Sequence, residues 1–539
     1  MRTRLALVAW AVFWAGALTL ADTYPRNPDI DVLHYVFAVT LSDASDEIAG
    51  EATLDVRVVR AGVAEFSVDL IGRSAEREGK GMTVEAVRDR GVVVPFQHAG
   101  DRVRIRLATP AAAGERRRMT VTYRGTPADG LVISKNKHGE RTFFADNFPD
   151  RARHWLPAVD HPADKATCEF IITAPDRYRV IATGLKIEES DLPEGGRRTH
   201  WRTAVPVSTY NMVVGAARFA VQYADRMDGV SIETWAYPQD RDAWFRAFAV
   251  TRRVAEFYAF RVGPYAYEKL ANVESRTRFG GMENAGNIFY TEKLGVERGA
   301  EGIAAHEIAH QWFGDSVTES DWHHAWLSEG FATYFTHLYN EFTYGRERLT
   351  SGLQDDRRGV IEYARKNPDL RVVDPRVPEN RVLSTYTYQK GGWVLHMLRR
   401  KIGDEKFWAG IREYYKKYRN GTALSEDLRD VMEAASGAEL AGFFQQWLYE
   451  PGHPKLRLTW AYDPPAKVLS VTVDQTQPGR PFSVDLDLGI TLADGTRRIE
   501  TIELAGPSRS VAIPLDAAPV AVAMDPDTWL LAEFDGGKR

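Results

Sequence analysis

The segment from Gly302 to Tyr334 constrains this chain most, because its side chains must converge on one point. His306, Glu307 and His310 stand in the spacing H-E-x-x-H, and Glu329 follows after eighteen intervening residues. On an α-helix, positions i and i+4 share a face, so both imidazoles can bind one ion. Two imidazoles, a carboxylate and an open fourth position are the ligand set of a catalytic zinc site, which predicts one Zn²⁺ at His306, His310 and Glu329. Glu307, rotated about 100° around the helix from His306, would lie beside the metal and handle protons.

The length and composition predict a globular protein of several domains. The chain has 539 residues, of which 44% are hydrophobic and 27% charged, and this length favours three or four domains. The formal net charge of -5 is small, so no nucleic acid is expected as a partner. Cys168 is the single cysteine, which excludes an intrachain disulfide and is typical of a buried structural thiol.

The first residues are typical of a signal peptide. Arg2 and Arg4 precede the apolar stretch LALVAWAVFWAGAL, and small residues allow cleavage after Ala21. We therefore expect a signal peptide over 1–21 and an exported protein, either periplasmic or secreted. The apolar run is short for a membrane span, which needs roughly 20 residues, so no stable span is expected after cleavage. An uncleaved anchor is the alternative.

Hydrophobic periodicity divides the rest of the chain into three domains. Period-two alternation dominates residues 22–228, which predicts an antiparallel β domain. Residues 229–452 are mostly helical, starting with a helix over 240–263 that ends at Gly263-Pro264. Alternating strands return over 453–539, with a hairpin at 493–496, and predict a small β-sandwich. The fold class is therefore a multidomain α+β protein.

Two further segments bear on the predicted zinc site. The paired Gly280 and Gly281 permit close backbone approach at a strand edge, so a peptide could lie along them with Glu283 placed to bind its positive charge. A tight turn with an exposed glutamate is the alternative. Tyr386 and Tyr388 precede a second glycine pair, and a tyrosine hydroxyl near the metal can donate to a developing oxyanion. The residues alone do not decide between these two tyrosines.

Taken together and in this order, four motifs resemble the M1 family of zinc aminopeptidases, which includes aminopeptidase N and leukotriene A4 hydrolase. They are H-E-x-x-H-x18-E, Gly-Gly-Met-Glu-Asn, W-L-S-E-G-F-A-T-Y and Y-x-K-G. The resemblance spans nearly the whole mature chain and implies a thermolysin-like catalytic domain between the two β domains.

The resemblance also implies a role for each matching residue. His306, His310 and Glu329 would bind zinc, and Glu307 would be the general base. Tyr388 would stabilise the oxyanion, with Tyr386 the lesser candidate. The substrate would be a peptide with a free N-terminus, its α-amine captured by Glu283, and single residues would be removed from that end. The expected contacts of the peptide are Gly280, Gly281, Met282, Glu283 and Asn284.

Three departures from the family pattern affect these expectations. Many members carry a Gln or Glu in the β domain that helps to bind the α-amine, whereas an ungapped match places Phe148 there. Asp146 or Asn147 would then take over this contact. His323-His324 stands where acidic residues are frequent, and surface histidines are favoured there over an extra metal site. The C-terminal helical domain of many members is absent from this sequence, which predicts a more open cleft.

Three other functions compete with this interpretation. A non-catalytic peptide-binding protein on the same scaffold should have lost a ligand or the base, and here all four residues stand. An epoxide hydrolase-like activity lacks any sign of a lipid channel. An endopeptidase is disfavoured by Glu283, which would obstruct a chain that continues past its N-terminus.

Overall fold

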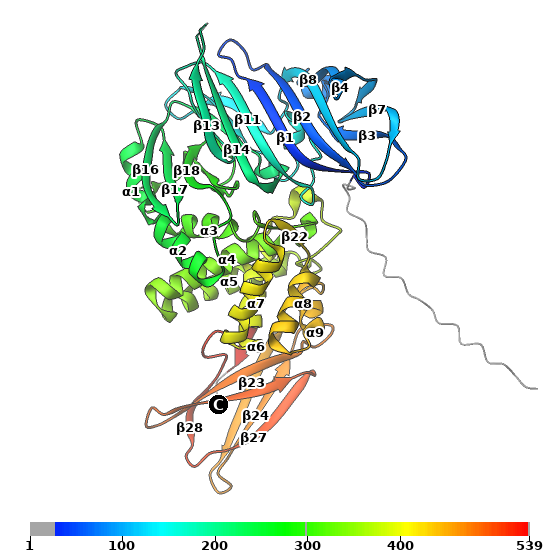
Figure 1. The fold of residues 1–539 in the computed structure, drawn as a ribbon. Coiled ribbons are helices and arrows are strands. Elements are labelled where there is room, and N and C mark those ends of the chain that lie inside the picture. Colours follow the sequence, from blue (N-terminus) through cyan, green and yellow to red (C-terminus); the bar gives the residue numbers. More distant parts are fainter. Residues whose placement is uncertain (1–26, 194, 297–298, 537–539) are drawn as a thin grey trace, which may run out of the picture.

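The computed structural model describes residues 27–193, 195–296 and 299–536. The predicted signal peptide at 1–21 lies outside these residues. Among the helices within them, none combines the length and apolar character needed to cross a membrane. A β-rich domain, a helical middle and a small β domain follow one another along the molecule (Figure 1), which confirms the predicted fold class.

Alternating side chains build the N-terminal domain around an eight-stranded sheet. In its strand β1, Tyr35, Phe37 and Val39 are buried while the residues between them are partly exposed. Neighbouring strands of this sheet pair antiparallel, as predicted, except that β1 and β11 run parallel. Its strands, in order across the sheet, are β13 (Leu185–Asp191), β14 (Arg197–Ser208), β11 (Lys165–Ala174), β1 (Ile30–Thr40), β2 (Ile48–Val58), β8 (Arg116–Thr126), β4 (Gly81–Asp89) and β5 (Val92–Val93).

Two smaller sheets and short helical turns complete this domain. One sheet has the order β3 (Val63–Asp69), β7 (Arg102–Ala111) and β6 (Phe96–Ala99); the other has β12 (Arg179–Ala182), β15 (Val214–Ala217), β10 (Arg141–Ala145) and β9 (Leu131–Lys135). The turns are η1 (Ala75–Arg77), η2 (Ala152–His154) and η3 (Thr209–Asn211).

A five-stranded sheet joins the N-terminal domain to the helices. Its first strand, β16, pairs with β17, so this sheet begins ahead of the domain boundary expected after residue 228. The core of the N-terminal domain extends under this sheet, since it includes Met282 and Phe289. The order is β16 (Ala220–Met227), β17 (Val230–Ala236), β18 (Lys269–Ser275), β20 (Asn287–Thr291) and β19 (Gly281–Met282), which places β19 at an edge.

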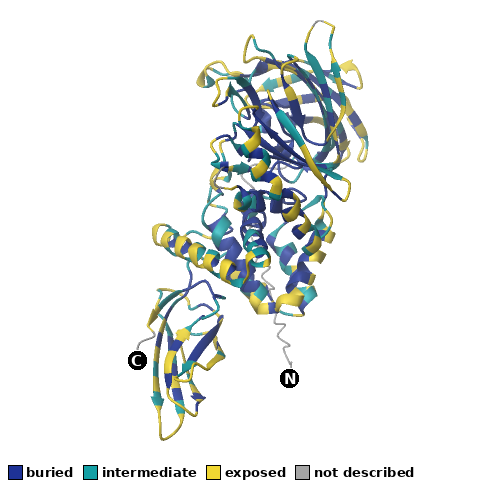
Figure 2. Cartoon of the chain, turned by 90° about the vertical axis from the view of Figure 1, so that its left-hand side faces the viewer, coloured by how far each residue is buried: buried dark blue, intermediate teal, exposed yellow. Residues whose placement is uncertain are grey.

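The helices α3, α5 and α6 pack against α4, and the inner faces of the helical domain are buried (Figure 2). The single helix predicted over 240–263 is two helices, α1 and α2, separated by the turn η4. At this break the Thr251 hydroxyl donates to the Phe248 carbonyl and accepts from Asn272. The helices are α1 (Arg241–Ala247), α2 (Thr251–Arg261), α3 (Glu301–His310), α4 (Trp326–Tyr344), α5 (Arg346–Lys366), α6 (Gly391–Ile402), α7 (Asp404–Tyr418), α8 (Ser425–Ser436) and α9 (Ala441–Leu448). Shorter elements are η4 (Phe248–Val250), η6 (Trp322–His324), η7 (Glu379–Arg381), η8 (Tyr386–Lys390) and the paired strands β21 (Val317–Glu319) and β22 (Gly421–Ala423).

Two sheets form the C-terminal domain. The predicted hairpin joins β25 to β26, and Gly495 adopts a φ of 86° in its turn. The domain is bound to the helices by side-chain contacts: His396 in α6 hydrogen-bonds the Thr528 carbonyl at 2.8 Å and stacks on Trp529. One sheet is β27 (Ser508–Pro514), β24 (Val468–Gln475), β23 (Lys455–Asp463) and β29 (Glu533–Gly536); the other is β26 (Arg497–Leu504), β25 (Val484–Leu492) and β28 (Pro519–Met524).

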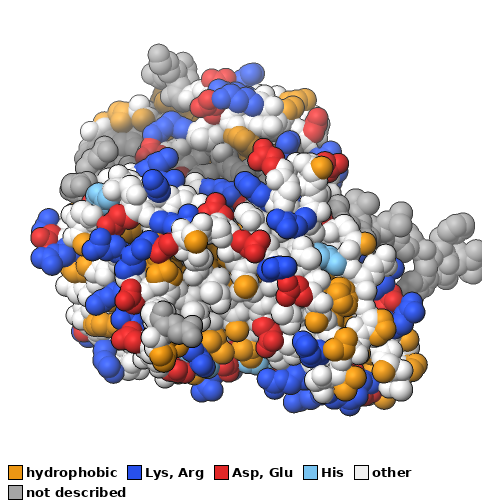
Figure 3. Space-filling model, turned by 90° about the horizontal axis from the view of Figure 1, so that it is seen from above, with side chains coloured by type: hydrophobic (Ala, Val, Ile, Leu, Met, Phe, Trp, Pro, Cys, Tyr) orange, Lys and Arg blue, Asp and Glu red, His pale blue; other side chains and the backbone are white. Residues whose placement is uncertain are grey.

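Charged side chains of both signs are interspersed on the surface seen from the end of the eight-stranded sheet (Figure 3). Elsewhere on the eight-stranded sheet, ion pairs link neighbouring strands, such as Arg57 with Asp31 and Arg124 with Glu85. Such exposed pairs contribute little to stability, at most about 1 kcal/mol each. The face in Figure 3 shows no continuous patch of one sign.

Candidate active site

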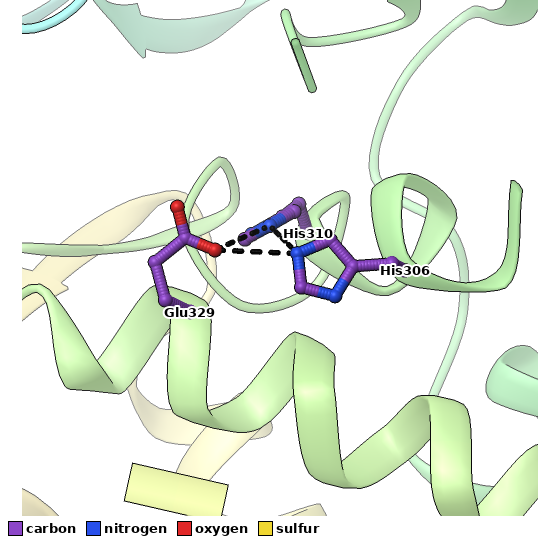
Figure 4. Close-up of side chains that lie close together, drawn as sticks. All are labelled: His306, His310 and Glu329. Atoms are coloured by element: carbon purple, nitrogen blue, oxygen red, sulfur yellow. Dashed lines mark hydrogen bonds and ion pairs between the residues drawn. The ribbon is translucent and has the colours of Figure 1, made fainter. Parts of the chain in front are cut away.

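The three predicted ligands, His306, His310 and Glu329, meet between α3 and α4. The Nε2 atoms of His306 and His310 lie 3.2 Å apart, and Glu329 Oε2 lies 3.2 Å from the first and 3.3 Å from the second. Figure 4 shows the three side chains pointing toward one another. Ligands about 2.0 Å from a tetrahedral zinc ion are separated from one another by roughly 3.3 Å. The donor atoms are therefore spaced as zinc ligands, and these residues fit the metal.

Outer contacts fix the orientation of the ligands. His310 Nδ1 lies 3.1 Å from the Phe313 carbonyl and 2.9 Å from the Ser328 hydroxyl. A hydrogen on Nδ1 donated to this carbonyl leaves the Nε2 lone pair free for a metal. Glu329 is positioned by the close approach of α4 and α6, where a Cβ added to Gly330 would lie 2.8 Å from the Gly391 carbonyl carbon.

The charges of the triad suit a bound cation. Burial alone would raise the pKa of Glu329, but the facing His310 and His306 imidazoles hold that pKa below its ordinary value. Burial lowers the pKa of His306, which favours the neutral ligand form. The pKa of His310 is raised well above its ordinary value against the effect of burial, chiefly by Glu329 and then Glu283. A metal ion would supply the positive charge that a proton on His310 otherwise supplies.

Glu307 lies against the edge strand β19. A Cβ added to Gly281 would lie 2.2 Å from Glu307 Oε1, so only glycine leaves room for this carboxylate. Burial raises the pKa of Glu307 well above its ordinary value. Carboxylate oxygens of Glu307 and Glu283 and a ring nitrogen of His310 lie within 4.8 Å of one another. The structure thus brings Glu307 and Glu283 together beside the metal-binding triad.

Glu283 follows β19 directly and is buried. Burial raises the pKa of its carboxyl to about 7, and its backbone carbonyl accepts a 2.6 Å hydrogen bond from Gln311 Nε2. Gln311 also donates to Asp315 Oδ2 at 2.7 Å. These bonds hold Glu283 in place from the end of the zinc helix. The alternative of an exposed glutamate at this turn is therefore wrong.

The two tyrosines occupy different places, although both lie in the π-helical turn η8. The Tyr388 hydroxyl donates to Glu329 Oε1 at 2.6 Å, and its ring stacks parallel to the His306 ring at 5.9 Å. Tyr386 is buried away from the site, with its ring 5.2 Å from that of Tyr363. Lys390, which ends the turn, donates to the Gly452 carbonyl at 3.0 Å. The geometry therefore favours Tyr388 for chemistry at the triad.

These groups surround a cavity of about 240 Å³. The predicted contacts Gly280, Gly281, Met282 and Glu283 line it, while Asn284 is buried outside its wall. Ile303 and Leu383 had no sequence signal, because Ile303 comes from the zinc helix and Leu383 from a distant loop. The full lining is Phe148, Phe279, Gly280, Gly281, Met282, Glu283, Ile303, His306, Glu307, His310, Glu329, Leu383 and Tyr388.

Asp146 and Asn147 do not line this cavity. The Asp146 carboxylate binds Arg151 at 2.7 Å and the Arg278 backbone N–H at 3.2 Å. The Asn147 amide bonds the Met212 carbonyl and the Trp155 indole. Both side chains are occupied in structural roles, so the expectation that either takes over the amine contact is not supported by their positions. Phe148 alone of this segment reaches the cavity.

The paired histidines before Glu329 also have structural roles. His323 is buried and its ring nitrogens bond Asp321 Oδ1 at 2.8 Å and the Val377 carbonyl at 3.0 Å. His324 Nδ1 bonds the Ser425 hydroxyl at 2.8 Å. The expectation of surface histidines is wrong for His323, because these contacts draw it into the interior.

Two family models match this chain. Residues 33–211 match the peptidase M1 N-terminal domain, and residues 246–447 match the peptidase family M1 domain. The second match contains the triad, Glu283, Glu307 and Tyr388.

Individual relatives share 26% to 29% sequence identity with this chain. Tricorn protease-interacting factor F2 of Thermoplasma volcanium is 29% identical over 354 residues, which cover 61% of this chain and 43% of that protein. Glutamyl aminopeptidase of Mus musculus is 26% identical over 367 residues, covering 65% of this chain and 39% of that protein. The chain therefore spans less than half the length of these relatives. A crystal structure of an M1 zinc metallopeptidase variant from Deinococcus radiodurans shares the fold, with a TM-score of 0.65 and 24% identity over 79% of this chain and 95% of that one.

Proposed function

Because the chain belongs to peptidase family M1, we propose that it is a zinc-dependent aminopeptidase that removes single residues from the free N-terminus of peptides. The observation that carries this proposal is the position of Glu283. Its buried carboxylate lies with Glu307 and His310 in one group of ligand atoms within 4.8 Å. A carboxylate there can bind the α-ammonium of a peptide and so fix the first peptide bond over the catalytic groups.

Each charged or polar residue of the cavity outside the triad then has a task. Zinc, when bound to the triad, lowers the pKa of a water molecule and polarises the scissile carbonyl. Glu307 accepts the proton of the attacking water and passes it to the leaving amine, a role for which a raised pKa is suited. The Tyr388 hydroxyl donates to the oxygen on which negative charge develops. The edge strand β19 offers backbone groups along which the peptide can lie.

The proposal extends to where the enzyme works. An apolar segment behind Arg2 and Arg4 favours export, so the substrates would be peptides outside the cytoplasm. Detection of the protein only in the cytoplasmic fraction of an expressing bacterium would contradict this.

The decisive experiment compares aminoacyl anilides with their N-acetylated forms, with and without a chelator. We expect hydrolysis only of the free-amine compounds, because acetylation removes the charge that Glu283 binds. Glu283→Ala should lower kcat/KM on the free-amine compounds by roughly 100-fold or more, as for loss of a charge-assisted contact. Glu439→Ala is the control, since Glu439 is exposed. Comparable rates on acetylated compounds would exclude an aminopeptidase.

The role of Tyr388 is tested by a matched pair within one turn. We expect Tyr388→Phe to lower kcat by roughly 100- to 1,000-fold, the usual effect of losing one oxyanion donor, with KM little changed. Tyr386→Phe is the control: the Tyr386 hydroxyl is buried and has no hydrogen-bond partner among the described residues, so its loss should leave kcat near that of the wild type. Equal effects of the two substitutions would remove Tyr388 from the mechanism.

A further inference from the structure

The side chains of the catalytic cavity divide into two sets. One set contains the metal ligands, Glu283, Glu307 and Tyr388, whose tasks are given above. Glycines apart, the other set is wholly apolar and comes from separate elements. It comprises Phe148, Phe279, Met282, Ile303 and Leu383, and we call it the apolar wall.

Phe148 is firmly held in the apolar wall. It is 7% exposed, and its ring packs edge to face on Trp322 at 4.8 Å, on Tyr210 at 5.9 Å and on Phe279 at 6.1 Å. Aromatic pairs in this geometry add stability beyond the area they bury. The ring therefore cannot swing aside to admit a polar group from behind it.

The charged groups behind the apolar wall neutralise one another. Asp146 is bound by Arg151 and by the Arg278 backbone, and the Arg278 guanidinium pairs with Asp129. The Arg151 guanidinium lies over the Phe279 ring, 5.9 Å from its centroid. A charged substrate side chain placed against Phe148 and Phe279 would find no free partner in this network.

We propose that the apolar wall is the pocket for the side chain of the first residue, and that it selects peptides with an apolar N-terminal residue such as leucine, methionine or phenylalanine. This inference rests on the proposed aminopeptidase function. With the α-ammonium on Glu283 and the first carbonyl at the metal-binding triad, the remaining surface of the cavity is the apolar wall. A lysine or glutamate side chain would bury its charge there without a partner, which is strongly unfavourable.

The first test compares kcat/KM for leucyl, methionyl, phenylalanyl, lysyl and glutamyl anilides on the wild-type protein. We expect the three apolar substrates to exceed the two charged ones by roughly 100-fold. Similar values for lysyl or glutamyl anilides overturn the specificity while leaving the aminopeptidase intact. Absence of hydrolysis of every free-amine anilide overturns the proposed function, so the two failures are distinguishable.

The second test introduces a charge into the apolar wall. Leu383→Glu is suitable because Leu383 is only half-buried, and Phe148→Glu probes the firmly held side. We expect each to raise the ratio of lysyl to leucyl kcat/KM by about tenfold or more, the effect of an added ion pair. The ratio is taken within one preparation, so loss of folded protein cancels. Leu185→Glu, at an exposed position in β13, is the matched control, and an unchanged ratio in Leu383→Glu overturns the assignment.

Discussion

Replacement of Glu307 by glutamine is expected to lower kcat by roughly 10³- to 10⁴-fold on any aminoacyl anilide, because the amide cannot accept the proton of the attacking water. The substitution keeps the shape of the side chain, so it respects the tight space against Gly281. Zinc content and thermal stability should remain near those of the wild type. Steady-state kinetics, metal analysis and a melting curve measure the three quantities.

The control for Glu307→Gln is Glu301→Gln on the same helix. Glu301 lies at the first turn of α3 and pairs with Arg253 and Tyr339 at the surface. Its substitution tests the effect of losing a carboxylate from α3 without touching the cavity. If Glu307→Gln retained more than a tenth of wild-type kcat, another group would have to be the base.

Removal of zinc is expected to abolish activity and to lower the melting temperature. Several buried carboxylates surround the triad, and a bound cation stabilises the folded chain by mass action. His310→Ala should reduce the zinc content from one ion per chain to well below one, and added zinc should not restore activity. Dialysis against a chelator should give the same loss in the wild type, but zinc should reverse it.

His324→Ala is the control for the metal. Its ring bonds Ser425 and not the triad, so we expect one zinc ion per chain and near-normal kcat. A fall in zinc content with His324→Ala would show a second site at the histidine pair. Full activity of the metal-free wild type would contradict the whole mechanism.

The sequence predicts all three residues of the triad, but not the cavity around it. Helical spacing alone places His306 and His310 on one face, whereas the position of Glu329 depends on how closely α4 packs on α6 through Gly330. Phe148, Ile303 and Leu383 lie far apart in the chain, and their meeting is a result of domain packing. No spacing rule could have indicated it.

Two expectations, for Asp146 and for the helix over 240–263, differ from the structure. Asp146 lies two residues before Phe148, but its carboxylate is bound by Arg151 and by the Arg278 backbone N–H. The pattern over 240–263 has a continuous helical period, whereas the helix breaks at η4, where Asn272 in β18 donates a hydrogen bond to the Thr251 hydroxyl. Both outcomes involve a contact with a residue distant in the chain, Arg278 in one case and Asn272 in the other, which single-sequence periodicity does not contain.

The hydrogen bond from Lys390 to the Gly452 carbonyl affects which domains can be exchanged without disturbing the active site. The turn that carries Tyr388 is anchored at its end to the linker that opens the C-terminal domain, and α6, which continues that turn, is held to the same domain by His396 and Thr528. Exchange of this β domain for another would alter the support of a catalytic side chain. A domain exchange that preserves this support must therefore keep the helical domain together with the C-terminal one.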